Sequence, residues 1–181
     1  MHYTRKGDNG KTSICAGKIS KDSPLLEALG CVDELNSYAG VCRAEANKNG
    51  ARDIANAVYE LQNGLFILQA ELARYDKKIT RAHIDELETL IERAESEIPP
   101  QDSFIVTGET KLSAHIDTAR AIARRAERRI TALRLKKSEI PAYINRVSSL
   151  LYVLARLSAL REGKKEQPPG YPSSPCDPNR I

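Results

Sequence analysis

Apolar residues recur at the spacing of an α-helix in five segments, and this constrains the fold more than any other feature. At about 100° per residue, the Leu, Ile, Val and Ala residues of each segment gather on one side. The segments span about residues 24–46, 52–75, 80–98, 104–130 and 141–160, and the fourth is a turn at Thr107-Gly108 followed by a helix. No stretch shows strand-like alternation of useful length. The pattern predicts an all-α helical bundle.

Composition agrees with one domain packed by aliphatic side chains. Hydrophobic residues make up 41% of the 181 residues, with two Phe and no Trp. A chain of this length can bury a real core. We expect one domain over residues 1–162 and an irregular, proline-rich tail over 163–181.

Several protein classes are excluded by what the chain lacks. No stretch approaches the roughly 18 apolar residues of a membrane span, and the N-terminus has no apolar signal core. The four cysteines and three histidines show no zinc-binding spacing, so no protein-ligated metal is expected. We expect reduced thiols and a cytoplasmic protein.

The fourth segment carries a local excess of positive charge. Four of the five residues 124 to 128 are charged, and three of those are arginines. Helical spacing places Arg120 and Arg124 at the edge of the apolar side, and Arg125 and Arg128 away from it. Guanidinium groups suit bidentate binding of phosphate or carboxylate. An anionic ligand and an ordinary solvated face of charge pairs are both compatible with this run.

The N-terminal residues TRKGDNGKTS (4–13) have no helical period. The sequence Gly10-Lys11-Thr12 is similar to the end of a phosphate-binding P-loop, but that motif needs a glycine where Arg5 stands and a preceding strand, so we reject it. A glycine loop rich in backbone N–H groups, hydroxyls and cations can still cradle a polyphosphate. A disordered terminus is the alternative.

Three further residues are candidates without an assigned partner. Asp33 borders the apolar stripe of the first helix, and the edge arginines of the fourth helix could pair with it; an exposed Asp is the alternative. Asn145 faces solvent or a ligand. Phe104 belongs to a short apolar run outside any helix, and could plug the end of the bundle. No nucleophile elbow or H-E-x-x-H motif is present, so an enzyme here would work by positioning and electrostatics.

Taken together, six segments resemble the PduO-type ATP:cob(I)alamin adenosyltransferases, in the family's order over about residues 3–160. They are YTRKGDNGKTS (3–13), SKDSP (20–24), ALGCVDELNSYAG (28–40), FIVTG (104–108), ARAIARRAERR (119–129) and YINRVSSLLYVLAR (143–156). Six segments in sequence are a specific signal, whereas any one alone would be weak.

The resemblance implies a five-helix bundle with ferritin-like up-down packing, an ordered N-terminal arm, and a homotrimer with active sites between subunits. It implies transfer of the 5′-deoxyadenosyl group of ATP to the cobalt of cob(I)alamin, with Mg²⁺ held chiefly by phosphate oxygens. Neither membrane nor nucleic acid is then an expected partner. From the residues alone, the alternative is a helical-bundle adaptor or nucleic-acid-binding protein that uses the arginine-rich helix.

The resemblance also implies roles for individual residues. Those matching the ATP-binding positions are Thr4, Arg5, Lys6, Gly7, Thr12, Ser13, Lys21, Arg124, Arg128 and Asn145. Asp33 would pair with Arg120 across the subunit interface. Phe104 would lie beside the corrinoid and help to exclude the lower axial ligand of cobalt. Only Arg125 and Arg129 would remain ordinary surface residues.

The sequence departs from the family pattern in two places. Thr107-Gly108-Glu109 stands where the family commonly has Pro-Gly-Gly, which adds a negative charge beside the expected corrinoid. The glycine-rich part of the arm is reduced to residues 15–18, CAGK.

Overall fold

The computed structural model describes residues 5, 7–101 and 103–170 of the chain. Five helices follow a two-stranded antiparallel hairpin. The elements are β1 (Lys11–Ile14), β2 (Gly17–Ser20), α1 (Pro24–Lys48), α2 (Arg52–Leu72), α3 (Arg81–Glu95), α4 (Lys111–Ala132) and α5 (Ile140–Arg161). The prediction of an all-α five-helix bundle is therefore confirmed.

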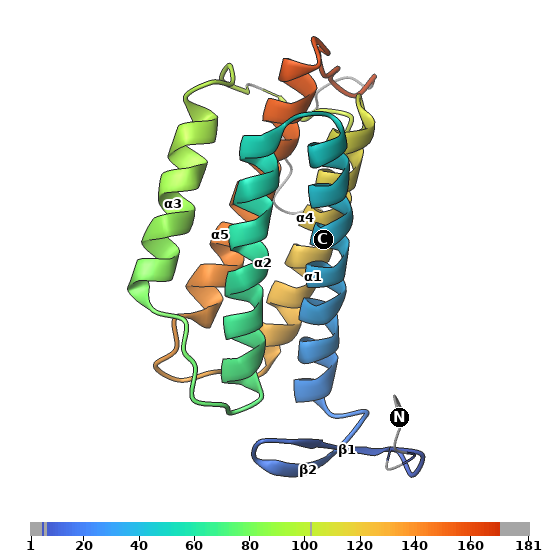
Figure 1. Cartoon of the computed structure of the whole chain (residues 1–181), viewed down its shortest axis with the longest axis vertical. Helices are drawn as coiled ribbons and strands as arrows, with labels where there is room; N and C mark the ends of the chain where they lie inside the picture. The colour runs from blue at the N-terminus through green and yellow to red at the C-terminus, as the bar shows by residue number, and fades with distance from the viewer. Residues whose placement is uncertain (1–4, 6, 102, 171–181) are drawn as a thin grey trace, which may run out of the picture.

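Successive helices run in alternating directions along the long axis of the molecule (Figure 1). Helix α1 packs against α2 and α4, α4 packs against α5, and α3 packs mainly on α5. The hairpin lies beyond the foot of α1, below the bundle in the view of Figure 1. The arm is thus an appendage at one end of the bundle, and the loop that joins α3 to α4 crosses the other end.

The hairpin corrects one prediction, since we expected no strand in the chain. Its strands have four residues each, which is too short for alternation to stand out in the sequence. Gly17 turns the chain with a φ of 115°, a conformation that favours glycine.

The helix starts follow from local sequence. Ser23 caps α1 by accepting a hydrogen bond from the amide of Leu26 at 3.4 Å, and proline occupies the first turn. Thr110 caps α4 and accepts from the amide of Ser113 at 3.1 Å. The segment before Thr110 is therefore a loop, as the predicted turn at Thr107-Gly108 requires.

Helix α5 lies at the centre of the packing. Residues 153–159 are all buried, although an amphipathic helix would expose part of such a run. Tyr143 is one of the largest fully buried side chains, and α2 accommodates it only because residue 64 is glycine. A Cβ atom at Gly64 would lie 1.8 Å from the Tyr143 hydroxyl oxygen.

Candidate functional site

The hairpin divides the predicted arm ligands between two faces. Thr12 pairs with Ile19 and Ser13 pairs with Lys18. Because neighbouring residues of a strand point to opposite faces, Ser13 lies on the face of Lys18, and Thr12 on the other face. The face of Thr12 is half-buried, whereas Ser13 and Lys18 are exposed. A ligand on one face would therefore meet only one of the two hydroxyls directly.

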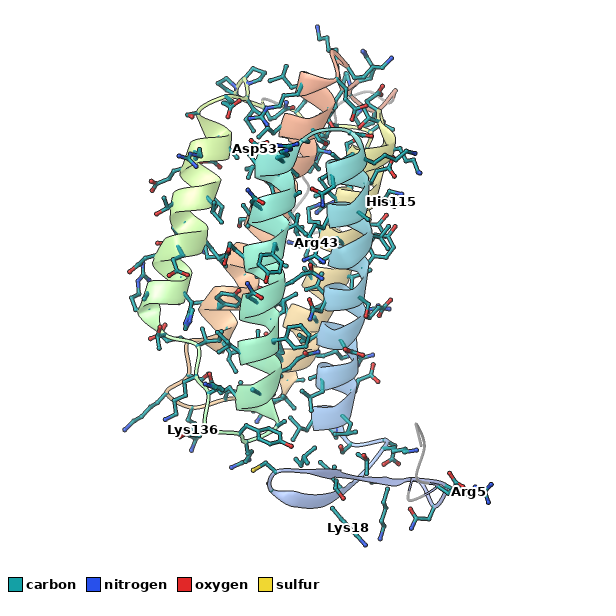
Figure 2. All side chains as sticks on the ribbon, in the orientation of Figure 1. Arg5, Lys18, Arg43, Asp53, His115 and Lys136 are labelled. Carbon is teal, nitrogen blue, oxygen red and sulfur yellow. The ribbon has the colours of Figure 1, made fainter. Side chains whose placement is uncertain are left out.

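The chain folds back on itself before the hairpin and brings Gly7 and Lys21 together. The amide of Lys21 donates to the carbonyl of Gly10 at 2.9 Å, and the amide of Gly10 donates to the carbonyl of Gly7 at 3.2 Å. The Lys21 Nζ lies 2.9 Å from the place where a Cβ of residue 7 would stand. Arg5 and Lys18 both lie at this arm, below the bundle (Figure 2). Thr4 and Lys6 are outside the described residues.

Helix α4 uses its arginines in two ways. Arg125 forms an ion pair with Glu34 of α1, and the Nε of Arg129 lies 3.3 Å from Oε1 of Glu27, also in α1. Arg124 and Arg128 are exposed, and no ion pair forms with them among the described residues. They lie four residues apart and so share one face of the helix. The positive charge that remains for a ligand is concentrated on these two residues.

Arg125 lies off the buried stripe of α4, as helical spacing places it, but it is not an ordinary solvated residue. Arg125 is half-buried because α1 packs against that side of α4, and its Nε atom is buried without a partner among the described residues. Its ion pair with Glu34 raises the pKa of its guanidinium above the ordinary range. Two acidic residues of α1 thus interrupt the basic run that a nucleic-acid-binding helix would present.

Asn145 of α5 lies next to the same turn of α4. Its Nδ2 donates to the Oε1 of Glu127 at 3.0 Å, and its Oδ1 accepts from Nη1 of Arg146 at 2.9 Å. Glu127 belongs to the turn of α4 that separates Arg124 from Arg128. The structure therefore places the predicted amide of α5 beside the α4 turn that carries both predicted arginines.

Asp33 and Arg120 do not meet within one chain. Asp33 is exposed and accepts from Nε2 of Gln69 in α2 at 3.5 Å. Arg120 donates from its Nε to Oδ1 of Asp117 at 3.3 Å, in its own helix. No edge arginine of α4 reaches Asp33 among the described contacts. The predicted pair across a subunit interface stays a prediction.

Phe104 does not plug the end of the bundle, because 82% of its surface is exposed. Its neighbours Ser103 and Ile105 line a cavity of about 640 Å³, whose other walls include Arg156 and residues of the segment 163–168. The amide of Val106 donates to the carbonyl of Gln167 at 2.8 Å, which ties the two walls together. Residues 163–170 form no helix or strand.

A buried ionic cluster around Arg156 lies behind this cavity, and the sequence pattern does not predict it. Arg156 is 2% exposed, forms an ion pair with Asp117, and donates from its Nε to Oε1 of Glu166 at 2.7 Å. Burial alone would lower the pKa of Arg156, but the hydrogen bond and charge of Asp117, with those of Glu166, raise it above the ordinary range. The signal available in the sequence was a single arginine within the apolar run 147–159.

In the described part of the chain, no three side chains of His, Cys, Asp or Glu gather where they could hold a metal ion. None of the helices there combines the length and apolar character needed to cross a membrane.

The fold and the site define a class of helical-bundle protein that suits a polyanionic ligand. Its cations without a described ion pair on α4 are Arg124 and Arg128, and its N-terminal arm is polar and contains glycine. The chain belongs to the cobalamin adenosyltransferase family, whose model matches residues 2–158.

Two relatives and one solved structure illustrate the similarity. The chain is 37% identical over 170 residues to the corrinoid adenosyltransferase of Bacillus subtilis, covering 89% of this chain and 88% of that protein. It is 38% identical over 165 residues to the corrinoid adenosyltransferase PduO of Salmonella typhimurium, covering 85% of this chain but only 48% of that protein. A PduO-type ATP:corrinoid adenosyltransferase from Lactobacillus reuteri, a Phe-to-Ala variant complexed with cobalamin and ATP, superposes with a TM-score of 0.87. That match is 30% identical and covers 94% of this chain and 100% of the other.

Proposed function

We propose that this chain transfers the 5′-deoxyadenosyl group of ATP to the cobalt of cob(I)alamin, giving adenosylcobalamin and triphosphate. The observation that carries the proposal is the family match over residues 2–158, joined to a fold shared with a structure that holds both cobalamin and ATP. The cobalt electron pair attacks the 5′ carbon, the bond from that carbon to the phosphate oxygen breaks, and triphosphate leaves with the electrons of that bond. The substrate supplies the nucleophile, so the protein needs none of its own.

The exposed arginines of α4 would bind the triphosphate. Arg124 and Arg128 are the cations of this helix that no described carboxylate neutralises. Placed against phosphate oxygens, they would stabilise the charge that develops on the leaving group. Asn145 would add an amide beside them. The arm would contribute Gly7, Lys21 and either Thr12 or Ser13.

Mg²⁺ would arrive with ATP. Because the described residues gather no set of three acidic, His or Cys side chains, phosphate oxygens would be its principal ligands. The ion would neutralise triphosphate charge, and the residues of this chain would orient the nucleotide.

Phe104 would act on the corrinoid through its bulk. Its side chain is 82% exposed beside a cavity of about 640 Å³, so a ligand could cover the ring without breaking any packing contact of the core. An aromatic ring placed under the corrin would occupy the space of the lower axial ligand, and lower coordination makes reduction of cobalt accessible. Glu109, in place of a family glycine, would bring a negative charge close to this site.

A homotrimer would complete the site, and one face of α1 and α2 supports it. Tyr59 and Phe66 are 48% and 63% exposed, and lie on the same strip of α2 as Gln62. The buried Oδ1 of Asn36 and Oε1 of Gln62 have no hydrogen-bond partner among the described residues. Large exposed aromatics beside unsatisfied polar atoms are what a surface shows when a second subunit covers it. Asp33 lies on the exposed side of α1, so it would contact the neighbouring subunit there.

Incubation with reduced cobalamin and Mg-ATP tests the proposal. Wild-type protein should yield a light-sensitive adenosyl product and triphosphate; no product under strict reduction would disprove the function.

Arg124→Ala and Arg128→Ala should each weaken ATP binding by roughly 10-fold to 150-fold, as expected when a charge-assisted hydrogen bond of about 1.5–3 kcal/mol is lost. Arg129→Ala is the matched control, because that arginine already pairs with Glu27 and should leave the KM for ATP unchanged.

A location in the cytoplasm belongs to the same proposal. Cys15, Cys31 and Cys42 are free thiols, and Cys15 is exposed, which suits a reducing compartment. Cell fractionation with antibody detection tests this location.

A further inference from the structure

The buried cluster around Arg156 has a balanced charge. Arg156 and Arg120 contribute two guanidinium groups, and Asp117 and Glu166 contribute two carboxylates. The side chains of Arg156, Asp117 and Glu166 are only 2%, 6% and 7% exposed. Removing one partner would leave a buried charge uncompensated, so the cluster holds its members in one arrangement. The ring of Tyr152, 5.0 Å from the Arg156 guanidinium carbon, covers it further.

Glu166 is the link from this cluster to the segment that follows α5. Its carboxylate accepts from the Nε of Arg156, with the two oxygens at 2.7 Å and 2.6 Å. Residues 163–170 have no regular secondary structure, and among those described Glu166 is the side chain that forms an ion pair with the bundle. The next residue, Gln167, accepts the hydrogen bond of the Val106 amide at 2.8 Å through its carbonyl.

Val106 in turn lies two residues after Phe104. Among the described residues 103–109, this amide makes the backbone hydrogen bond that connects the loop to another part of the chain. A continuous chain of contacts therefore connects α4 and α5 to the segment that carries Phe104, and it passes through Glu166 and Gln167.

We propose that Arg156 is a positioning residue for the Phe104 segment and that it acts through Glu166 and Gln167. The inference rests on the proposed function, because it assigns Arg156 to the placement of the aromatic ring beside the corrinoid. Arg156 is 2% exposed, so its role would be to hold Glu166 in place rather than to bind ATP or corrinoid. Loss of the Arg156–Glu166 ion pair would free the Val106 amide from the Gln167 carbonyl and let Phe104 move. A small misplacement of a group that acts on a substrate lowers the rate by up to about 100-fold.

Hydrogen exchange of the full-length protein tests the mechanical link without any substrate. Glu166→Gln keeps the size of the side chain and removes its charge, so the peptide containing Val106 should exchange at least several-fold faster. Glu162→Gln is the matched control, since Glu162 is exposed and its side chain makes no described contact. Unchanged exchange at Val106 in Glu166→Gln would overturn the proposal.

A spectroscopic measurement tests the functional part. In the presence of ATP, Glu166→Gln should reduce the fraction of cob(II)alamin that has lost its lower axial ligand, seen by electron paramagnetic resonance, and lower kcat by about 10-fold to 100-fold. The Kd for ATP should change less than about twofold, because the arginines of α4 that would bind ATP are untouched. A merely structural role would instead weaken the binding of ATP and of corrinoid together, whatever the change in melting temperature, and that outcome would also overturn the proposal.

A second pair of variants guards against a folding artefact. Arg156→Lys keeps a cation but loses the bidentate fork, and should reproduce the effect of Glu166→Gln. Arg161→Lys alters a comparable ion-pair anchor at the same end of α5, to Asp53 and Glu97, without contact to Glu166, and should leave the cobalt spectrum unchanged. If the wild type forms no adenosylcobalamin, the proposed function fails, while the exchange experiment still decides whether the link exists.

Discussion

Asp33→Ala and Arg120→Ala are expected to weaken one and the same contact between subunits. Asp33 is exposed, and the Arg120 side chain keeps 29% of its surface in contact with solvent, so both can reach a neighbouring chain. A coupling of about 1.5 kcal/mol is typical of a directly contacting charge pair. A closed trimer repeats each contact three times, which gives about 4.5 kcal/mol per trimer. At about 1.4 kcal/mol per factor of ten, this changes the trimer association constant about 1600-fold.

Sedimentation velocity over a concentration series measures the effect directly. Because three subunits associate, the midpoint concentration changes as the square root of the association constant, so each single variant should raise it about 40-fold. The double variant should raise it by a similar factor, since the pair is already lost in each single variant. A double variant that raises the midpoint about 1600-fold, the product of the two, would refute the contact.

The control for this cycle is an ion pair inside one chain. Glu34 and Arg125 pair between α1 and α4, with side chains 51% and 42% exposed. Exposed pairs contribute about 0.2–1 kcal/mol, so Glu34→Ala and Arg125→Ala should lower the melting temperature slightly. Neither should change the midpoint of trimer assembly.

Three further outcomes follow from particular contacts. Gly64→Ala should lower the free energy of unfolding by about 1–3 kcal/mol, because its Cβ would lie 1.8 Å from the Tyr143 hydroxyl oxygen, and thermal melting measures this loss. Adding Tyr143→Phe to the same chain should restore only part of the lost stability, since the ring carbon that carries the hydroxyl would still lie 2.7 Å from that Cβ. Phe104→Ala should leave the melting temperature unchanged while abolishing most adenosyl transfer, since the side chain is 82% exposed; a large loss of stability would show that it is a packing residue. The hydrogen bond from Arg146 holds the pKa of Glu88 below its ordinary range, so the stability that this pair contributes is present above the ordinary pKa of a glutamate and is lost as the pH falls through the lowered pKa. Urea unfolding between pH 6 and 3 should show a smaller loss of stability in acid for Arg146→Ala than for the wild type.

The sequence predicts those parts of the fold that depend on neighbouring residues. A cap such as Ser23 followed by Pro24 acts within one turn, so the start of α1 is visible without any tertiary information. The hairpin depends on pairing between Lys11–Ile14 and Gly17–Ser20, and four-residue strands joined by Cys15-Ala16 carry neither clear alternation nor a typical turn dipeptide. The hairpin is therefore not visible in the sequence pattern.

The site divides in the same way. Helical spacing places Arg124 at the edge of the apolar side of α4, but it cannot show that Glu34 of α1 reaches Arg125, because that contact depends on how the two helices pack. Arg156 is harder still. Its guanidinium contacts Asp117 of α4 and Glu166 of the irregular segment after α5. No periodicity in the sequence brings these three residues together.

One chain presents the parts of the proposed site without joining them. The arm lies beyond the foot of α1, whereas the loop that carries Phe104 crosses the opposite end of the bundle (Figure 1). Arg125 and Arg129 are neutralised by α1, which leaves Arg124 and Arg128 facing outward with their charge uncompensated by the described residues. Like charges four residues apart repel each other, so keeping them both unpaired costs stability unless an anion binds there. The distribution of ion pairs along α4 is therefore an argument for a polyanion at this surface that does not depend on family resemblance.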